Sequence, residues 1–424
     1  MHLRVFFVFI VELFMLDSFA QVPFLNVRID HKGRPEEPSI CIDPAHPNQL
    51  VAGANIRFVY ASRDTGRTWS KRQIHSEWNV AGDPCIVVDT AGDFYYFSLS
   101  NADSWLDRMI CNKSKDGGAT WTEETYVGFN VLKDQDKEWA CVDPLNNALY
   151  LTWTEFDHYG SKSPYDSSHI LFARSLDAGK TWTEPLRLDE HGGDCLDGDN
   201  TVEGAVPAVG PKGEIYVAWA GPLGLTMDCS LDGGNTWRDQ DIPIGTIPGG
   251  WTYDIPGIYR CNGLPVTLCD RSSGAFSGRV YVHWSDQRNG EEDTDLWLTW
   301  SDDGGMKWQP PVRVNQDSGK AQQFMSWMTI DHKTGTLWCV FYDRRQHPES
   351  DSTDVFLAWS TDGGQTFQDT LISATPFLPN KKIFFGDYCN ITAYDQIIRP
   401  IWTRLDGKKL SIWTALIDGR KLTK

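Results

Sequence analysis

The segment Ser62-Arg63-Asp64-Thr65-Gly66-Arg67-Thr68-Trp69 sets a pattern that the chain repeats. Five further copies of Ser-x-Asp-x-Gly-x-x-Trp begin at Ser114, Ser175, Ser230, Ser301 and Ser360, the last with Phe367 in place of tryptophan. Successive motif aspartates lie 52, 61, 55, 71 and 59 residues apart, a spacing typical of proteins built from repeated supersecondary units. Asp and Ser can bond N–H groups within a turn, and Gly supplies a positive φ. Each motif therefore predicts a hairpin turn anchored by an aromatic ring.

Strand-like segments surround each motif in the same order. In the first repeat, residues 37–43, 50–55 and 59–62 precede the turn, and a fourth strand follows it. A seventh unit without the motif supplies only three such segments, at residues 387–392, 398–403 and 410–415. Residues 24–29 have no other partner and can provide the missing strand, which would close the array and remove its exposed edges. The count favours seven units, with six as the alternative.

The six motifs resemble the Asp-boxes, or BNR repeats, of the sialidase superfamily of β-propellers. The resemblance covers nearly all of residues 22–424 and implies an all-β fold, a β-propeller of four-stranded antiparallel blades closed by the N-terminal strand. A closed propeller can use this length as one domain, so we expect a single domain over residues 21–424. In such a propeller the motif turns lie on the outer rim, and their aspartates are structural.

Residues 1–20 are predicted to form a cleavable signal peptide, with an apolar run over residues 5–16 and a small-x-small site at Ser18-Phe19-Ala20. The protein is therefore expected to be secreted or periplasmic, without a membrane anchor after cleavage. A net charge of −18 argues against a nucleic-acid partner, because phosphate binding requires basic patches. Most of the ten cysteines are expected to be small core residues, and Cys261 with Cys269 is the preferred local disulfide.

Two sets of loops of the expected propeller converge on one mouth: those that enter the inner strands, and those that join the second and third strands. Reading these positions from the repeats gives carboxylates from several blades, Glu37, Asp83, Glu138, Glu203 and Asp387, and arginines from others, Arg57, Arg288, Arg344, Arg345 and Arg404. This mixture suits glycoside chemistry on an anionic sugar, since carboxylates transfer protons and guanidiniums bind carboxylates. The alternative, for an Arg beside an Asp in a motif such as Asp343-Arg344-Arg345, is a salt bridge that braces the loop.

The resemblance also implies roles for individual residues. Asp83 resembles the acid/base of family sialidases, and Glu203 with Tyr388 resembles their nucleophile pair. Members of an arginine triad are expected among Arg288, Arg344 or Arg345, and Arg404, with Arg57 as another choice. The family's early Arg-Ile-Pro element is absent from this sequence.

Three functions follow, and the first ranks highest. The protein is expected to be an exported glycoside hydrolase of exo-sialidase type, acting on sialic acid or a related anionic sugar in a glycan. The alternatives are a polysaccharide lyase on uronic-acid glycans and a non-catalytic glycan- or protein-binding propeller. No cofactor and no metal site is predicted, although the sequence leaves a structural Ca²⁺ and the oligomeric state open.

Overall fold

A computed structural model describes residues 24–423 of the chain. The predicted signal peptide lies outside these described residues. The regular elements of the part that the structure describes are β-strands, apart from one short 3₁₀ helix, η1 (Gly419–Lys421). Among these residues, no helix is long or apolar enough to cross a membrane.

Seven four-stranded antiparallel sheets form the blades of a propeller, which confirms the predicted blade number. Blade one consists of β2 (Ser39–Ile42), β3 (Leu50–Ala54), β4 (Phe58–Ser62) and β5 (Ser70–Gln73). Blade two consists of β6 (Val80–Val88), β7 (Phe94–Ser100), β8 (Arg108–Ser114) and β9 (Glu123–Val127). Blade three consists of β10 (Asp134–Val142), β11 (Leu149–Phe156), β12 (Ser168–Ser175) and β13 (Leu186–Arg187). Blade four consists of β14 (Glu203–Val209), β15 (Ile215–Gly221), β16 (Gly224–Ser230) and β17 (Ile242–Gly245). Blade five consists of β20 (Val266–Cys269), β21 (Val280–Asp286), β22 (Asp295–Ser301) and β23 (Val312–Arg313). Blade six consists of β24 (Gln323–Asp331), β25 (Thr336–Asp343), β26 (Asp354–Ser360) and β27 (Gln368–Leu371). Blade seven consists of β28 (Asn390–Tyr394), β29 (Ile397–Asp406), β30 (Lys409–Asp418) and β1 (Leu25–Asp30). A small additional hairpin, β18 (Thr252–Tyr253) and β19 (Cys261–Asn262), lies between blades four and five in the chain.

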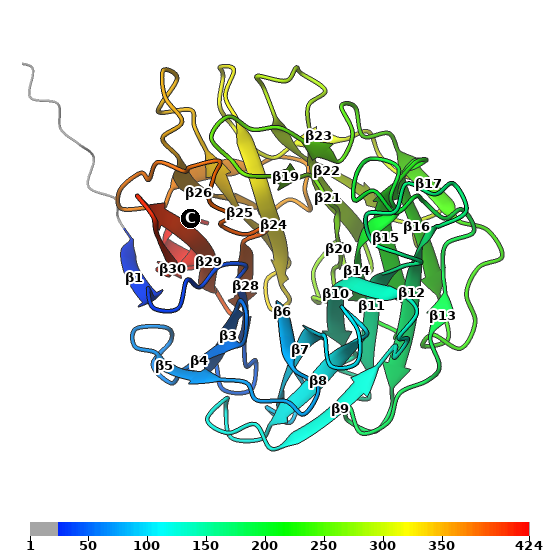
Figure 1. The fold of residues 1–424 in the computed structure, drawn as a ribbon. Helices are drawn as coiled ribbons and strands as arrows, with labels where there is room; N and C mark the ends of the chain where they lie inside the picture. Colours follow the sequence, from blue (N-terminus) through cyan, green and yellow to red (C-terminus); the bar gives the residue numbers. More distant parts are fainter. Residues whose placement is uncertain (1–23, 424) are drawn as a thin grey trace, which may run out of the picture.

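The first strand of each blade is its inner strand, and the blades follow one another around a ring in chain order (Figure 1). Each inner strand contacts the inner strand of the next blade, and β2 contacts β28, so the ring is closed. The N-terminal strand β1 pairs antiparallel with β30, with Val27 opposite Thr414. This pairing confirms the predicted closure by the N-terminal strand.

The six repeated motifs form the turns between the third and fourth strands of blades one to six. In every copy the Ser hydroxyl donates to the Asp carboxylate at 2.8–2.9 Å and accepts the Gly amide at 2.8–2.9 Å. That glycine has φ between +81° and +89°, a region that favours glycine over other residues. The aspartates are thus used by their own turns, as the sequence predicted.

The core consists of apolar clusters between neighbouring blades, with fully buried rings such as Trp153, Trp219 and Trp402. All ten cysteines are free thiols in the described structure. The expected bridge between Cys261 and Cys269 is therefore wrong: Cys261 belongs to the added hairpin β18–β19, whereas Cys269 ends the inner strand of blade five.

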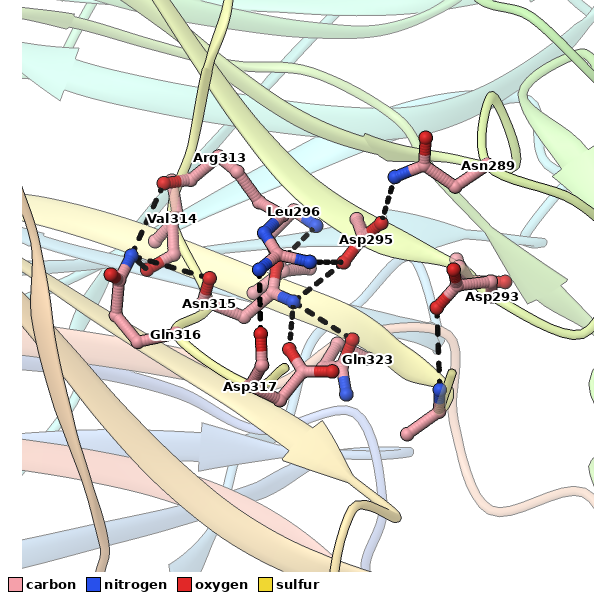
Figure 2. Close-up of polar contacts among 12 residues, drawn as sticks. Asn289, Asp293, Asp295, Leu296, Arg313, Val314, Asn315, Gln316, Asp317 and Gln323 are labelled. Atoms are coloured by element: carbon pink, nitrogen blue, oxygen red, sulfur yellow. Dashed lines mark hydrogen bonds and ion pairs between the residues drawn. The ribbon is translucent and has the colours of Figure 1, made fainter. Parts of the chain in front are cut away.

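A buried polar network joins blades five and six (Figure 2). The Asn315 side-chain amide donates to the Asp295 carboxylate at 2.6 Å, to Asp317 at 2.6 Å and to Gln323 at 2.9 Å. Its oxygen accepts the Leu296 amide at 2.9 Å. Since Asn315, Asp295 and Gln323 are fully buried, this one amide satisfies polar groups that would otherwise destabilise the fold.

Candidate active site

The inner strands of four blades carry a bulge near their first residues, at the same end of the propeller. The residue at the bulge has a left-handed backbone in each: Asp83 in β6 (φ 54°), Lys137 in β10 (φ 53°), Gly204 in β14 (φ 77°) and Met325 in β24 (φ 45°). Bulges re-aim side chains and are common beside active sites. The structural equivalent of Asp83 in blade three is therefore Lys137, and Glu138 is one position further on.

These inner strands surround a cavity near the propeller axis, which we call the central cavity. The empty space between its lining residues, including space open to solvent, amounts to about 620 Å³. Its polar and aromatic lining comprises Asp83, Lys137, Glu138, Trp139, Asn262, Ser285, Ser326, Trp327, Asp387 and Tyr388. Four of the predicted site residues, Asp83, Glu138, Asp387 and Tyr388, are thus brought together from three blades.

A smaller cavity adjoins the central one and shares Lys137, Asn262, Leu264 and Asp387 with it. This side cavity, of about 270 Å³, is where Glu203 lies, together with Asp197 and Arg260. Glu203 is 1 % exposed, and burial raises its pKa, with a further contribution from Asp197. Glu203 and Tyr388 therefore line neighbouring cavities rather than one.

Glu138 is the most unusual group of the central cavity. Its side chain is 2 % exposed, and neither carboxylate oxygen has a hydrogen-bond partner among the described residues. Burial raises the pKa of Glu138 well above its ordinary value, and the nearby Asp83 carboxylate raises it further. A buried polar group without a partner is rare in a stable core, so this carboxyl group is a candidate for contact with a ligand.

The phenol of Tyr388 is in a similar state. Its Oη atom is buried and has no hydrogen-bond partner among the described residues, so it is not bonded to Glu203. Burial raises the pKa of Tyr388, and the carboxylates of Asp83, Glu37 and Glu138 raise it further. Its ring meets Trp139 edge to face, with centroids 5.9 Å apart.

Asp387 is held by cations. The Lys137 ammonium lies 2.9 Å from its carboxylate, and the Arg260 Nε atom lies 2.8 Å from it. Burial alone would raise the pKa of Asp387, but these two cations bring it below its ordinary value. The Asp387 amide also donates to Glu37 at 3.0 Å, and Glu37 accepts a second hydrogen bond from Asn55. Glu37 and Asp387 are thus committed to contacts within the protein.

Two tryptophans close the central cavity along the axis. Trp139 of blade three and Trp327 of blade six have ring centroids 4.3 Å apart, with their planes inclined by 41°. Both rings are partly buried and also line a third cavity, further along the inner strands. They therefore present aromatic surface at the base of the carboxylate-lined cavity.

The five predicted arginines line neither the central nor the side cavity. Arg288 pairs with Asp286 at 2.6 Å and lies over the Trp297 ring at 4.0 Å. Arg345 pairs with Asp343 at 2.6 Å and with Asp369 at 2.7 Å, which is the loop-bracing alternative given by the sequence.

The remaining three arginines also have other surroundings. Arg344 is buried, donates to Thr353 at 3.1 Å, and has its pKa lowered to about 10 by burial. Arg404 pairs with Asp406 at 2.8 Å and donates to backbone oxygens of a neighbouring loop, whereas Arg57 is exposed on the β3–β4 turn. The structure does not bring the five guanidiniums together.

Sequence reasoning missed the two cations of the site. Lys137 occupies the bulge position that Asp83 occupies in blade two, so an alignment of the repeats at this position would have identified it. Arg260 lies on the added hairpin, which no other repeat contains, and pairs with Asp197 at 3.2 Å as well as with Asp387. Two more carboxyl groups lie near Asp83: burial, with a contribution from the Asp83 carboxylate, raises the pKa of Glu36 to about 8 and that of Asp136 to about 7.

One surface group of the described residues, Glu190, His191 and Asp241, has ligand atoms close enough to share a metal ion. Glu190 and Asp241 already accept each other's backbone amides at 3.1 and 3.0 Å, so these side chains join two loops. The group contributes nothing to either cavity.

Comparison with known proteins identifies similarity at the level of the fold. The sequence matches no protein-family model and no curated protein. A protein of unknown function from Dyadobacter fermentans shares 15 % identity, with a TM-score of 0.50 over 75 % of this chain and 93 % of that one. NanB shares 10 % identity, with a TM-score of 0.50 over 79 % of this chain and 67 % of that one. The Hadza microbial sialidase Hz136 shares 15 % identity, with a TM-score of 0.49 over 87 % of this chain and 73 % of that one. The chain thus has the fold of a sialidase-like β-propeller.

Proposed function

We propose that the protein is an exported glycoside hydrolase and that the central cavity is its active site. The observation that carries this proposal is the carboxyl group of Glu138, buried without a hydrogen-bond partner in the same cavity as Asp83 and Tyr388. Glycoside hydrolysis requires two carboxyl groups in different protonation states beside one glycosidic bond. The raised pKa of Glu138 favours the protonated form of this carboxyl group, as burial disfavours its charged form.

In this proposal Glu138 is the general acid, and it donates its proton to the oxygen of the leaving group. Asp83 lies on the neighbouring blade and is partly exposed, which suits a carboxylate that activates water or stabilises positive charge on the sugar. The Tyr388 hydroxyl has no hydrogen-bond partner among residues 24–423, and in the proposal it contacts the substrate. Trp139 and Trp327 provide aromatic surface on which a sugar ring can stack.

This assignment changes two roles expected from the sequence. Glu203 was expected to activate Tyr388, but it lines the side cavity next to Asp197 and Arg260 and has no part in the proposed reaction. Glu138, in the same cavity as Tyr388, takes the acid role that was expected of Asp83. The glycan partner and the export of the protein remain proposals that rest on this site and on the apolar N-terminal segment.

The test compares wild type with Glu138→Gln on fluorogenic glycosides, including a sialoside, neutral hexosides and a glucuronide. We expect wild type to hydrolyse at least one glycoside and the variant to lose about 100-fold or more in kcat/KM. Glu203→Gln is the matched control, because it removes a buried carboxylate from the side cavity, and its loss should be smaller. Unsaturated products that absorb in the ultraviolet, formed from uronic-acid polysaccharides, would instead indicate a lyase. Absence of any turnover would leave a binding propeller.

A further inference from the structure

The two adjoining cavities are rich in carboxyl groups. Five carboxyl groups line them, contributed by Asp83, Glu138, Asp197, Glu203 and Asp387. The cations among the lining residues are Lys137 and Arg260. Carboxyl groups therefore outnumber cations around a bound ligand, and two more, those of Glu36 and Asp136, lie near Asp83.

Both cations are already paired within the protein. Lys137 contacts Asp387, and Arg260 contacts Asp387 and Asp197. Asp83, Glu138 and Glu203 make no ion pair with a cation of the described residues. A carboxylate or sulfate entering the cavity would thus face acids without a free guanidinium to neutralise it.

From this arrangement we infer that the sugar bound in the central cavity carries no anionic group, so that the substrate is an uncharged glycoside. The inference rests on the proposed function and narrows its substrate class, away from the anionic sugar that the arginines of the sequence suggested. Carboxyl groups are well suited to sugar hydroxyls, since they accept hydrogen bonds when ionised and donate one when protonated. The apolar faces of a pyranose ring can contact Trp139 and Trp327.

The deciding experiment uses pairs of fluorogenic substrates that differ only at C6: glucoside against glucuronide, and galactoside against galacturonide, in both anomeric forms. A sialoside with the same fluorophore is the third arm. We expect kcat/KM for an uncharged member to exceed that of its acidic partner by about 100-fold or more, because like charges in a desolvated site repel. Preference for a uronide or the sialoside would overturn the inference while leaving the glycosidase proposal intact.

Two further measurements keep the result independent of any one variant. Asp197→Asn should reduce the difference in kcat/KM between the uncharged substrate and its acidic partner, because it removes one carboxylate without changing Asp83 or Glu138. Added NaCl should raise kcat/KM for the acidic member alone, since salt screens the repulsion that an anion meets at the solvent-exposed opening of the cavity. An equal change in both members would contradict the inference.

If no glycoside is hydrolysed, the proposed function fails and binding decides the inference. Saturation-transfer NMR then compares methyl glucoside and methyl galactoside with N-acetylneuraminic acid. Binding of an uncharged sugar that Trp139→Ala abolishes would support an uncharged ligand. Binding of the acid, or of none of the three, would overturn it.

Discussion

The Lys137 ammonium lies 2.9 Å from the Asp387 carboxylate, so that blade three is connected directly to blade seven across the propeller axis. The two residues are 250 positions apart in the chain. Asp387 in turn bonds Glu37, at the start of blade one, through its backbone amide. This ion pair and this hydrogen bond thus connect three blades beside the central cavity.

We expect Lys137→Met to lower the free energy of unfolding by about 1–3 kcal/mol, because Asp387 then keeps Arg260 as its only partner among the described cations. The side-chain size and the bulge position are retained by this change. Urea unfolding followed by tryptophan fluorescence measures the loss. Lys115→Met, which removes a solvent-exposed pair with Glu123, should leave stability unchanged. Equal stability of Lys137→Met and wild type would show that the pair does not hold the blades together.

Tyr388→Phe should reduce kcat by about 100-fold or more without destabilising the fold. The Tyr388 hydroxyl makes no hydrogen bond within the part of the chain that the structure describes, so its removal takes away a desolvated polar group rather than a stabilising contact. Tyr342→Phe is the matched control: its hydroxyl donates to the Thr403 oxygen at 2.8 Å and accepts the Thr403 amide at 3.1 Å. That control should lose about 1–2 kcal/mol of stability and keep its activity. A destabilised Tyr388→Phe with full activity would assign Tyr388 a structural role.

Stability should fall as the pH rises from about 4.5 to 8 because of Glu36. Burial raises the pKa of Glu36 from an ordinary 4.5 to about 8, with a smaller contribution from Asp83. Across this range the folded state holds a proton that the unfolded state has released, so each increase in pH favours unfolding. Urea unfolding measures the free energy of unfolding at pH 5 and at pH 8. The decrease between these two values should be smaller for Glu36→Gln than for wild type. An unchanged difference would mean that Glu36 titrates normally in the folded protein.

Most of the fold could be predicted from local sequence chemistry. The turn at Ser62, Asp64 and Gly66 forms from its own side chains, and therefore its spacing counts the blades reliably. The N-terminal strand could be placed because a seventh unit with three strands leaves one edge without a partner. Both predictions depend on short-range patterns that a single sequence contains.

The site could be predicted only where repeats align. Asp83, Glu138 and Tyr388 meet because inner strands start at one end, but the direction of an arginine depends on its neighbours. Arg288 follows Asp286 by two residues and pairs with it, and it lines neither cavity. Arg260 could not be anticipated, since the hairpin that carries it lies in the longest interval between motifs and has no counterpart in other blades.

Asp177→Asn should destabilise the turn of blade three by about 1 kcal/mol without affecting activity. The Asp177 carboxylate accepts the Thr181 hydroxyl at 2.6 Å and the Thr181 amide at 2.9 Å, and these bonds lower its pKa to about 2. The stabilisation by the ionised Asp177 carboxylate is present above pH 3.8 and is lost as the pH falls toward 2. The difference in free energy of unfolding between wild type and variant should therefore decrease in acid. Asp239→Asn, at an exposed position, is the control and should behave as wild type. A difference that stays constant down to pH 2 would contradict this role of the carboxylate.

Asn315→Asp should lower the free energy of unfolding by about 3 kcal/mol at pH 8, although it changes a single atom. In wild type the Asn315 amide nitrogen donates to Asp295, Asp317 and Gln323 (Figure 2). The substitution places an oxygen against these acceptors in a buried site, which raises the pKa of the new carboxyl group. In the folded variant this carboxyl group therefore keeps its proton to a higher pH than in the unfolded chain. The loss in free energy of unfolding relative to wild type should thus be smaller at pH 5 than at pH 8. Asn380→Asp is the control, because exposed Asn380 acts only as an acceptor for the Lys382 amide, and its stability should match wild type at both values. Equal deficits of Asn315→Asp at pH 5 and pH 8 would show that the loss comes from packing, not from charge.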